Sequence, residues 1–297
     1  MSITVRSYRY PEDFQPVGQF LVDTYSTGDR HRNWLQPRWE YMHFHPLLDE
    51  SSLGKIGIWQ DDGEIVAVVH HEHYMGEVYF EIAPDYAYLK RDMLQYAQEH
   101  LCRDVAEERL LQVYINGADH EFEAIAEGLG FQKDEKRREE MSQFEIVAPL
   151  ASIDVPAGFR LKSLQDDDDL YKTHRVLHRG FDHPGEPPAD GIEGRKKMQS
   201  APNFRKDLTI VVEAPDGSFV SLCGMWYEAT NKIAYVEPVA TDPDYRRRGL
   251  GTAAVLEGIR RCGELGATVA FVGTGKPFYK SMGFHEIYTF FLWSKRV

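Results

Sequence analysis

Hydrophobic and polar residues alternate along two separate stretches of this chain, and the same elements follow one another in both. A turn sequence containing Asp-Gly occurs at 61–63 in the first stretch and at 215–217 in the second. The β-rich runs beside these turns are 56–59 and 65–69, and 209–212 and 219–222. Asp-Gly between two β-rich runs is a strong signal for a tight turn between antiparallel strands. Each stretch is therefore predicted to contain a β-hairpin.

The later elements repeat in the same order. Another strand is predicted in each stretch, at 77–82 and 234–239, and each runs into the tripeptide Pro-Asp-Tyr. Apolar residues at helical spacing come next, at Leu89, Met93, Tyr96 and Ala97 and at Ala253, Leu256, Ile259 and Cys262. Each stretch ends with a further predicted strand, at 110–114 or 269–272, and then a Gly-Phe pair. These shared landmarks favour a tandem duplication of one α/β unit over a chance resemblance.

A segment rich in Pro, Ala and Gly at 148–158 separates the two stretches. Such a composition is typical of a linker. At roughly 100–200 residues per domain, the 297-residue chain is expected to form two domains, at 1–148 and 158–297. Each predicted unit has an N-terminal strand, two helices, an antiparallel hairpin, a strand–helix crossover, and a final helix and strand.

The formal net charge of -13 narrows the range of partners. Binding to DNA or RNA relies on cationic surface that replaces phosphate counterions, so this charge argues against a nucleic-acid partner. It mildly favours a cationic acceptor over an anionic one.

The three cysteines, Cys102, Cys223 and Cys262, are widely spaced. Their odd number and spacing indicate neither a disulfide framework nor a metal site. No apolar run approaches the length of about 18 residues that a membrane span needs, and the first residues lack the apolar stretch of a signal peptide. A cytoplasmic protein with reduced thiols, no metal and no membrane partner is expected.

The segment 239–252 carries the most informative chemistry. Gly249 and Gly251 lie between a predicted strand and a predicted helix, after three consecutive arginines at 246–248. Glycine lets a ligand approach the backbone closely, and a helix start offers unpaired N–H groups and the positive end of the helix dipole. Together these features predict an anion site. The alternative is a solvated basic turn, which the placement of the glycines disfavours.

This arrangement resembles the signature of the GNAT N-acetyltransferase superfamily, Gln/Arg-x-x-Gly-x-Gly/Ala, which Arg246, Gly249 and Gly251 fill. The later segment 278–284 resembles the closing Tyr-x-x-x-Gly-Phe element of the same family. A Rossmann fingerprint and a P-loop both fit less well. The resemblance covers about 159–297. It implies an α/β fold of two tandem GNAT-like domains, each a mostly antiparallel sheet with a central parallel strand pair flanked by helices.

The resemblance also implies acetyl-CoA as co-substrate, with no metal. In such enzymes the strand before the loop is splayed from its neighbour, and its free backbone groups bind pantetheine as an added strand would. The resemblance puts these groups at Val239, Ala240 and Thr241. The loop implied to hold the pyrophosphate consists of Arg246, Arg247, Arg248, Gly249, Leu250, Gly251 and Thr252. The acyl carbonyl is expected near the Val239 N–H, which could stabilise an oxyanion.

Two side chains are candidates for catalysis. Tyr279 matches the family tyrosine that protonates the CoA thiolate; the alternative is an ordinary amphipathic tyrosine. Glu237 is the candidate general base, because it precedes Val239 by two residues and is expected on the same sheet face. The family often places its base near the position of Tyr235, so a structural carboxylate that holds a bulged strand is an equal alternative for Glu237.

The first half lacks these features. The segment equivalent to the loop, 87–92, contains no glycine, and Ala126 stands where the second half has Tyr279. We therefore expect a degenerate GNAT-like domain that does not bind CoA and that supports the fold or forms one wall of the acceptor cleft.

Three other clusters invite a functional interpretation. Within 70–73, His71 and His73 share a strand face and Glu72 faces away, so a zinc site is incomplete and a solvated strand end is predicted. The aromatic residues between 34 and 41 are predicted to pack in the core, with an acceptor pocket as the alternative. The acidic loop at 180–190 either recognises a cation or is a surface loop.

The leading functional prediction is direct acetyl transfer from acetyl-CoA to the primary amine of a small molecule. A non-catalytic module that senses CoA or acyl-CoA is the first alternative. A tRNA-dependent aminoacyl transferase with tandem GNAT domains is a weaker one, because the acidic charge and the intact CoA loop both count against it.

Overall fold

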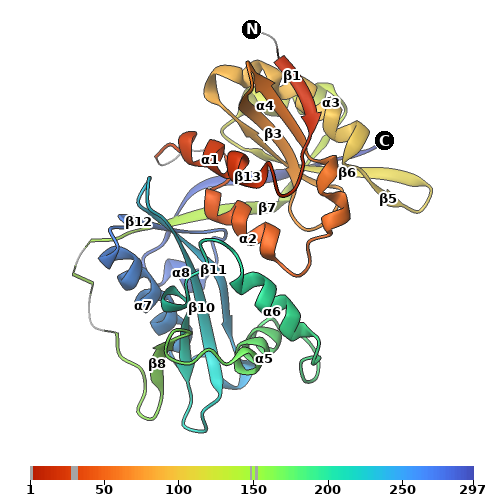
Figure 1. Cartoon of the computed structure of the whole chain (residues 1–297). Helices are drawn as coiled ribbons and strands as arrows, with labels where there is room; N and C mark the ends of the chain where they lie inside the picture. Colours follow the sequence, from red (N-terminus) through yellow and green to blue (C-terminus); the bar gives the residue numbers. More distant parts are fainter. Residues whose placement is uncertain (1–2, 28–32, 148, 151–152) are drawn as a thin grey trace. The chain divides into compact units, whose positions relative to one another are not determined.

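The computed structural model describes residues 3–27, 33–147, 149–150 and 153–297, which form two compact units (Figure 1). Unit 1 comprises residues 1–42, 47–141 and 286–297, and unit 2 comprises residues 43–46 and 142–285. These units do not coincide with the two halves of the sequence, because the end of the chain belongs to unit 1.

Unit 1 contains a mixed sheet with the strand order β1-β2-β3-β4-β6-β13-β7. Its strands are β1 (Ile3–Ser7), β2 (Gly57–Asp61), β3 (Glu64–His71), β4 (Glu77–Ile82), β5 (Arg103–Val105), β6 (Glu108–Asn116), β7 (Gln132–Glu145) and β13 (His285–Arg296). Its helices are α1 (Phe14–Asp23), α2 (Gln36–Phe44), α3 (Lys90–His100) and α4 (His120–Gly128), with 3₁₀ turns η2 (Glu50–Lys55) and η3 (Pro84–Leu89). Strands β4 and β6 form the parallel pair, and the neighbours β1–β2, β2–β3 and β3–β4 are antiparallel.

Unit 2 contains a sheet with the order β7-β12-β11-β10-β9-β8. Its further strands are β8 (Arg160–Ser163), β9 (Ile210–Glu213), β10 (Phe219–Glu228), β11 (Ile233–Thr241) and β12 (Val269–Val272). Its helices are α5 (Leu170–Gly180), α6 (Gly191–Gln199), α7 (Leu250–Glu264) and α8 (Pro277–Lys280), with 3₁₀ turns η4 (Lys206–Leu208) and η5 (Pro243–Tyr245). The parallel pair here is β11 with β12. The predicted fold class, a mostly antiparallel sheet with a central parallel pair in each unit, is confirmed.

Both predicted hairpin turns are present. Asp62 and Gly63 have φ angles of 49° and 92°. Two positive φ values are what a type I′ turn requires, and its twist matches that of the flanking strands. In unit 2 the N–H of Ala214 donates to the carbonyl of Ser218 at 2.9 Å and closes the equivalent turn.

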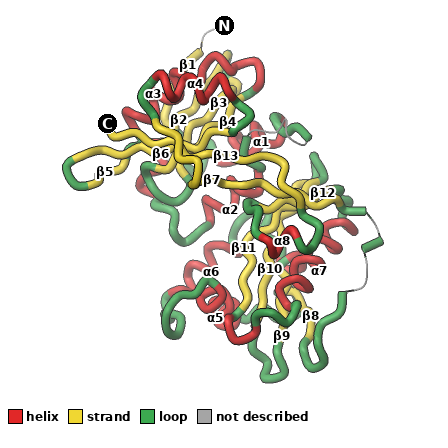
Figure 2. Tube along the Cα trace, turned by 180° about the vertical axis from the view of Figure 1, so that it is seen from behind, coloured by secondary structure: helices red, strands yellow, loops and turns green. Residues whose placement is uncertain are grey.

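The sheet of unit 2 is covered on both faces (Figures 1 and 2). Ile210 and Val212 of β9 pack in the same core cluster as buried residues of α7. Val211, between them, packs with Val176 and Leu177 of α5. Successive strand side chains point to opposite faces, so the continuous apolar run of β9 follows from burial on both sides.

The final strand of each sequence half takes a place in the other unit. Strand β13 pairs antiparallel with β6, from Phe290 opposite Asn116 to Arg296 opposite Leu110. Strand β7 begins in unit 1, and its last residues pair with β12 in unit 2, with Glu145 opposite Val269. Figure 1 shows the C-terminal strand among the strands of unit 1. The repeat in the sequence therefore does not mark the limits of the folded units.

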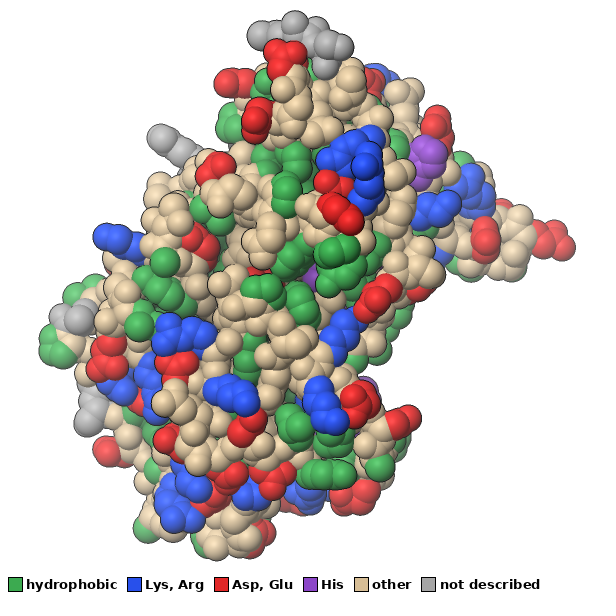
Figure 3. Space-filling view, in the orientation of Figure 1, with side chains coloured by type: hydrophobic (Ala, Val, Ile, Leu, Met, Phe, Trp, Pro, Cys, Tyr) green, Lys and Arg blue, Asp and Glu red, His purple; other side chains and the backbone are tan. Residues whose placement is uncertain are grey.

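None of the described helices is both long enough and apolar enough to cross a bilayer. Figure 3 shows acidic and basic side chains interspersed over the face that it presents. Interspersed charge is the pattern of a solvated surface, and it differs from the cationic stripe of a nucleic-acid-binding face.

Candidate functional site

A cavity of about 390 Å³ in unit 2 lies between the end of β11, the start of α7 and α8. Its lining residues are Val239, Thr241, Tyr245, Arg246, Arg247, Gly249, Leu250, Gly251, Thr252, Lys276, Phe278 and Tyr279. Most of the residues predicted to hold acetyl-CoA therefore lie around one space. Glu237, Ala240 and Arg248 are the predicted residues that are not among its lining.

The start of helix α7 forms one wall of this cavity. Gly249 precedes the helix with a φ of 78°, in the left-handed region, and no side chain caps the helix start. The first N–H groups of the helix are thus available to a ligand, and the helix dipole favours an anion there. A Cβ added to Gly251 would lie 2.9 Å from Thr241 Oγ1 and 3.3 Å from Phe278 Cζ. Glycine is therefore required at 251 by the close approach of the helix to the strand.

Strand β11 forms the opposite wall. One residue separates Cys223 from Met225 on β10, but two separate Val236 from Val239 on β11, so β11 carries an extra residue at a bulge. The pairing of β11 with β12 ends at Tyr235, opposite Phe271. Beyond that point the two parallel strands are splayed, and the outer edge of β11 from Val239 to Thr241 faces the cavity rather than a partner strand.

The three loop arginines differ in their surroundings. Arg246 donates from Nη2 to the Gly180 carbonyl at 2.9 Å and to Asp182 Oδ1 at 2.8 Å. Arg247 lines the cavity and makes no ion pair with a described residue. The guanidinium of Arg248 lies 5.2 Å from the centre of the Tyr245 ring. Two of the three cationic groups, Arg246 and Arg247, therefore lie where a phosphate-bearing ligand would be held.

Sequence analysis missed a buried ion pair beneath the loop. Asp242 is 1% exposed at its side chain, and Arg179 of α5 donates to both of its oxygens, at 2.5 and 2.9 Å. Burial alone would raise the pKa of Asp242, but the hydrogen bonds from Arg179 and from the Asp244 N–H hold it below its usual value. The pair fixes the end of β11 against α5. No local pattern announces it, because the partners are 63 residues apart.

Tyr279 lies on α8 at the inner end of the cavity and is 8% exposed. Its hydroxyl makes no hydrogen bond to a described residue. Burial, followed by the nearby Cys223 and Glu237, raises the pKa of this hydroxyl well above its usual value. Tyr279 is therefore protonated over the physiological range and is free to donate to a ligand.

The position of Glu237 differs from the expected one. The extra residue in β11 interrupts the strict alternation of faces, and Glu237 is not among the lining residues although Val239 is. Its carbonyl accepts a hydrogen bond from Trp226 Nε1 at 2.9 Å. Glu237 is still close enough to influence the pKa values of Tyr279 and Cys223. Its role as a base stays a prediction.

Two acidic side chains of the loop at 180–190 are engaged with arginines. Asp182 pairs with Arg246, and Glu186 lies 3.6 Å from Arg175. The loop thus contributes to the electrostatics of the phosphate loop.

The prediction of a solvated strand end at 70–73 is wrong. His70 and His71 are fully buried; His70 Nε2 lies 2.8 Å from Glu81 Oε1, and His71 Nε2 lies 3.0 Å from Ser52 Oγ. Polar residues on a strand suggest exposure to solvent, but partners distant in sequence satisfy these histidines in the core. The described residues include no group of three or more His, Cys, Asp or Glu side chains placed to hold a metal ion.

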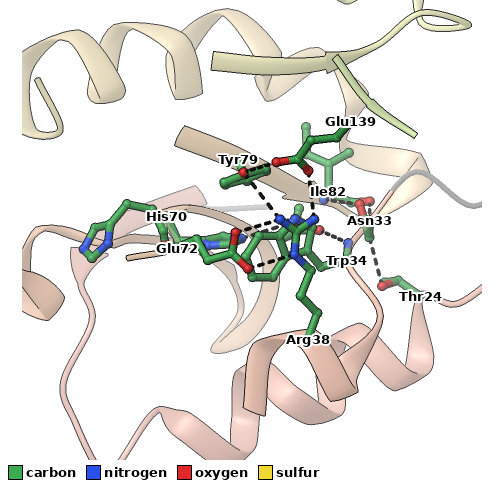
Figure 4. A network of polar contacts seen from close by, with 11 residues as sticks. Thr24, Asn33, Trp34, Arg38, His70, Glu72, Tyr79, Ile82 and Glu139 are labelled. Atoms are coloured by element: carbon green, nitrogen blue, oxygen red, sulfur yellow. Dashed lines mark hydrogen bonds and ion pairs between the residues drawn. The ribbon is translucent and has the colours of Figure 1, made fainter. Parts of the chain in front are cut away.

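Glu72 belongs to a network in the core of unit 1 (Figure 4). Arg38 pairs with Glu72 at 2.7 Å and with Glu139 at 3.0 Å, and its guanidinium lies 3.9 Å from the centre of the Trp34 ring. Tyr79 donates to Glu139 at 2.6 Å. Trp34 and its neighbours are thus core residues, as predicted, and they surround a buried charge.

A splayed parallel strand pair beside a glycine-led helix start is an α/β arrangement that binds a phosphate-bearing ligand at its open edge. A model of the acetyltransferase (GNAT) family matches residues 171–290. No protein with a curated description matches the sequence.

Solved structures of similar fold cover almost the whole chain. A GCN5-related N-acetyltransferase from Sphaerobacter thermophilus has a TM-score of 0.65 at 19% identity, covering 99% of this chain and 95% of that one. A tandem GNAT protein from the clavulanic acid biosynthesis pathway has a TM-score of 0.66 at 12% identity, covering 99% and 98%. At these identities the likeness concerns the fold.

Residues 171–290 thus match the acetyltransferase (GNAT) family model, and the whole chain has the fold of a tandem GNAT protein. The first half of this chain lacks the glycine-containing loop.

Proposed function

We propose that unit 2 transfers the acetyl group of acetyl-CoA directly to the primary amine of a small molecule. One observation carries the proposal: a single cavity combines an uncapped helix start, the free edge of a splayed strand and the unpartnered hydroxyl of Tyr279. These groups correspond to the phosphate, amide and thioester parts of acetyl-CoA. The enzyme is proposed to be cytoplasmic, with no nucleic-acid or membrane partner.

The residues present fit acetyl-CoA. The backbone of Val239, Ala240 and Thr241 would bind the pantetheine amides along the strand edge. Ala240 serves through its main chain only, because its side chain packs in the core toward α5. The diphosphate would be held by the helix start from Gly249 to Thr252 and by Arg246 and Arg247, with Arg248 supporting Tyr245.

The reaction joins the amine nitrogen to the thioester carbonyl carbon and breaks the carbon–sulfur bond. As the nitrogen attacks, negative charge develops on the carbonyl oxygen, and the Val239 N–H is proposed to stabilise it. The departing thiolate takes the proton of Tyr279, and the proton that the nitrogen loses as the amide forms restores the tyrosine hydroxyl. Burial keeps this hydroxyl protonated, so it is ready to donate in every turnover.

The amine must lose a proton before it attacks. At an ordinary lysine-like pKa of about 10.4, roughly one amine in a thousand is neutral at pH 7. Glu237 is proposed to accept this proton through a bridging water, because it lies outside the cavity lining yet near Tyr279.

The test is release of CoA thiol from acetyl-CoA across a panel of aminoglycosides, polyamines, amino acids and peptides with free N-termini. We expect release with one class, reduced about 100-fold or more in Tyr279→Phe, in line with the loss of a general acid. Tyr171→Phe is the matched control, because Tyr171 is 69% exposed on α5. Blanks without enzyme and without amine correct for the three protein cysteines.

The absence of Glu237 from the cavity lining favours one alternative, a module that senses CoA without turnover. That alternative predicts CoA binding that is unchanged in Tyr279→Phe and no thiol release with any amine. This combination of results would overturn the proposed acetyl transfer.

A further inference from the structure

Unit 1 retains a cavity at the position that the repeat makes equivalent to the acetyl-CoA cavity of unit 2. It has a volume of about 460 Å³ and lies among the ends of β4 and β6 and the starts of α3 and α4. Its lining residues are Thr24, Ser26, Asn33, Phe80, Ile82, Pro84, Ala87, Lys90, Tyr114, Ile115, Asn116, Asp119, Phe122 and Phe290. When the two Pro-Asp-Tyr tripeptides are superposed in sequence, Ile82 takes the position of Thr241 and Lys90 that of Gly249. The duplicated unit has therefore kept the space and changed the groups around it.

The strand edge in this cavity is already occupied by the protein. The side-chain amide of Asn33 accepts from the Ile82 N–H at 2.9 Å and donates to the Ile82 carbonyl at 3.1 Å (Figure 4). A second hydrogen bond runs from Asn33 Nδ2 to Thr24 Oγ1 at 3.0 Å. The groups that would bind a pantetheine amide in unit 2 are thus satisfied within unit 1.

The cation of unit 1 is also engaged by the protein. Lys90, at the first position of α3, is 5% exposed, and its ammonium group lies 2.8 Å from Asp119 Oδ1 and 2.8 Å from Glu121 Oε2. Both carboxylates lie at the start of α4. A phosphate would have to displace them from Lys90, so this end of the cavity does not favour an anion.

One buried donor in the cavity lacks a partner. Asn116 is 4% exposed, and its Oδ1 accepts from the Ala118 N–H at 2.9 Å. Its Nδ2 has no acceptor among the described residues. A buried unsatisfied donor destabilises the fold, and a ligand oxygen that accepts from it would remove this cost. Beside it stand the aromatic side chains of Phe80, Phe122 and Phe290, which suit a flat apolar body.

We infer that this cavity is a second ligand site, which takes a small uncharged molecule with an aromatic or similarly flat body and a carbonyl oxygen. The carbonyl oxygen accepts the Asn116 Nδ2 hydrogen bond, and the body packs among the phenylalanine rings. Phosphorylated and carboxylated molecules are disfavoured, because Asp119 and Glu121 already hold the Lys90 cation. The site is independent of acetyl transfer in unit 2.

The experiment titrates the full-length protein with benzamide and 2-naphthamide, followed by ligand-observed NMR and calorimetry. Phenyl phosphate is the charged counterpart. CoA is present at saturation throughout a parallel series, so that the cavity of unit 2 is filled. We expect saturable binding of the amides with one site per chain, unchanged by CoA, and no binding of phenyl phosphate when CoA is present.

Two variants locate the site. Asn116→Leu keeps the approximate volume and removes the donor, and it is expected to weaken amide binding about tenfold, the effect of one hydrogen bond. Ala87→Phe fills the rim of the cavity from a half-exposed position, and it is expected to abolish binding without affecting the core. Asn203→Leu, at an exposed position of unit 2, is the control.

Absence of saturable amide binding to the wild type would overturn the inference. So would binding that CoA displaces, because the amides would then occupy unit 2. Binding that survives Ala87→Phe in a protein with unchanged melting behaviour would overturn it as well, even if Asn116→Leu did not fold.

Discussion

The two cavities arise from the same repeated unit and differ in how their polar groups are satisfied. In unit 2 the helix start after Gly249 is uncapped and the edge of β11 has no strand partner beyond Tyr235. In unit 1 Lys90 is paired with two carboxylates from the start of α4, and the amide of Asn33 occupies the strand edge. We propose that these few side chains disfavour phosphate binding in unit 1, while the cavity persists because its walls belong to the sheet and helices of the core.

The backbones differ as well. Strand β11 carries an extra residue between Val236 and Val239, whereas β3 and β4 pair without interruption from Ala67 opposite Ile82 to His71 opposite Val78. A bulge changes the direction of a strand and of its side chains. Unit 2 thus has a distorted strand at its site, and unit 1 has the regular version of that strand.

The substitution with the largest expected effect places a residue of unit 1 at the equivalent position of the unit 2 cavity. Asp92 of unit 1 corresponds to Gly251. Gly251→Asp would bring a side chain within 2.9 Å of Thr241 Oγ1 and a negative charge to the helix start. We expect CoA affinity to fall about 1000-fold, from combined steric and electrostatic repulsion, as measured by calorimetry.

Gly128→Asp is the matched control for that substitution, because nothing lies within 4 Å of a Cβ added at Gly128 on α4. It introduces the same charge far from the loop in sequence. If Gly251→Asp bound CoA as tightly as Gly128→Asp does, the helix start of α7 would not be the phosphate site.

The next largest expected difference between the units is in how acid changes their folding stability. Burial, followed by the neighbouring His70, lowers the pKa of His71 to about 4. The unfolded chain, with a pKa near 6.5, binds a proton that the folded state does not, so stability is complete above pH 6.5 and falls as the pH drops toward 4. The loss for unit 1 is about 3 kcal/mol.

Hydrogen exchange at pH 7 and pH 5 measures this effect for each unit in the full chain. We expect β3 and its neighbours to lose protection on acidification more than β10 and β11 do. His71→Gln should remove most of that difference, since glutamine keeps a polar group near Ser52 without the titration. An unchanged pH dependence in the variant would assign the acid sensitivity to other groups.

Local patterns in the sequence were sufficient for the hairpins and for the glycine-led start of α7. Each depends on residues close together in the chain, such as the Asp-Gly turn at 61–63 or the glycines at 249 and 251. The exchange of final strands was not predictable in this way. Strands β7 and β13 each have the composition of a closing strand, and no local sequence feature indicates which sheet each strand joins.

Buried polar contacts were the other failure. In the sequence, His70 and His71 suggest a solvated strand end. In the fold, they contact Glu81 and Ser52 and are buried. The pair of Arg179 with Asp242 likewise depends on a contact across 63 positions. Polarity in a sequence predicts exposure only when no partner exists, and the partner is a property of the fold.

The ion pair below the loop should matter to stability by a smaller amount. Arg179→Met leaves Asp242, 1% exposed, with the Asp244 N–H at 3.0 Å and with Arg175, at 3.5 Å, as the remaining cation of its described ion pairs. We expect a loss of about 2 kcal/mol in the unfolding free energy of unit 2 at pH 7. The pKa of Asp242 is lowered in the folded state, so its contribution is present above the usual Asp pKa and disappears as the pH falls through the folded value.

Denaturant unfolding at pH 7 measures that loss, with Arg175→Met as the control for removing a nearby arginine. Arg175→Met should cost less, because Arg175 is farther from Asp242 and more exposed than Arg179. Equal losses for the two variants would mean that Asp242 is held by the general cationic surroundings and not by the bidentate contact.

The smallest expected effect concerns Asp182, which competes with the ligand of unit 2 for Arg246. Asp182 holds Arg246 at 2.8 Å and is 66% exposed, so the pair is weak and screened by solvent. A diphosphate must take Arg246 from Asp182, whereas in unit 1 the buried Lys90 is held by the buried Asp119 and the exposed Glu121. Asp182→Asn should therefore tighten CoA binding about threefold at low salt, and less at high salt. Asparagine also tolerates the φ of 58° at this position, so the backbone should not change.

Asp190→Asn is the control for Asp182→Asn, because Asp190 is an exposed position in the same loop. It should leave the CoA affinity unchanged. Calorimetry of both variants at two salt concentrations makes the comparison. Weaker binding in Asp182→Asn would mean that Asp182 orients Arg246 for the phosphate instead of competing with it.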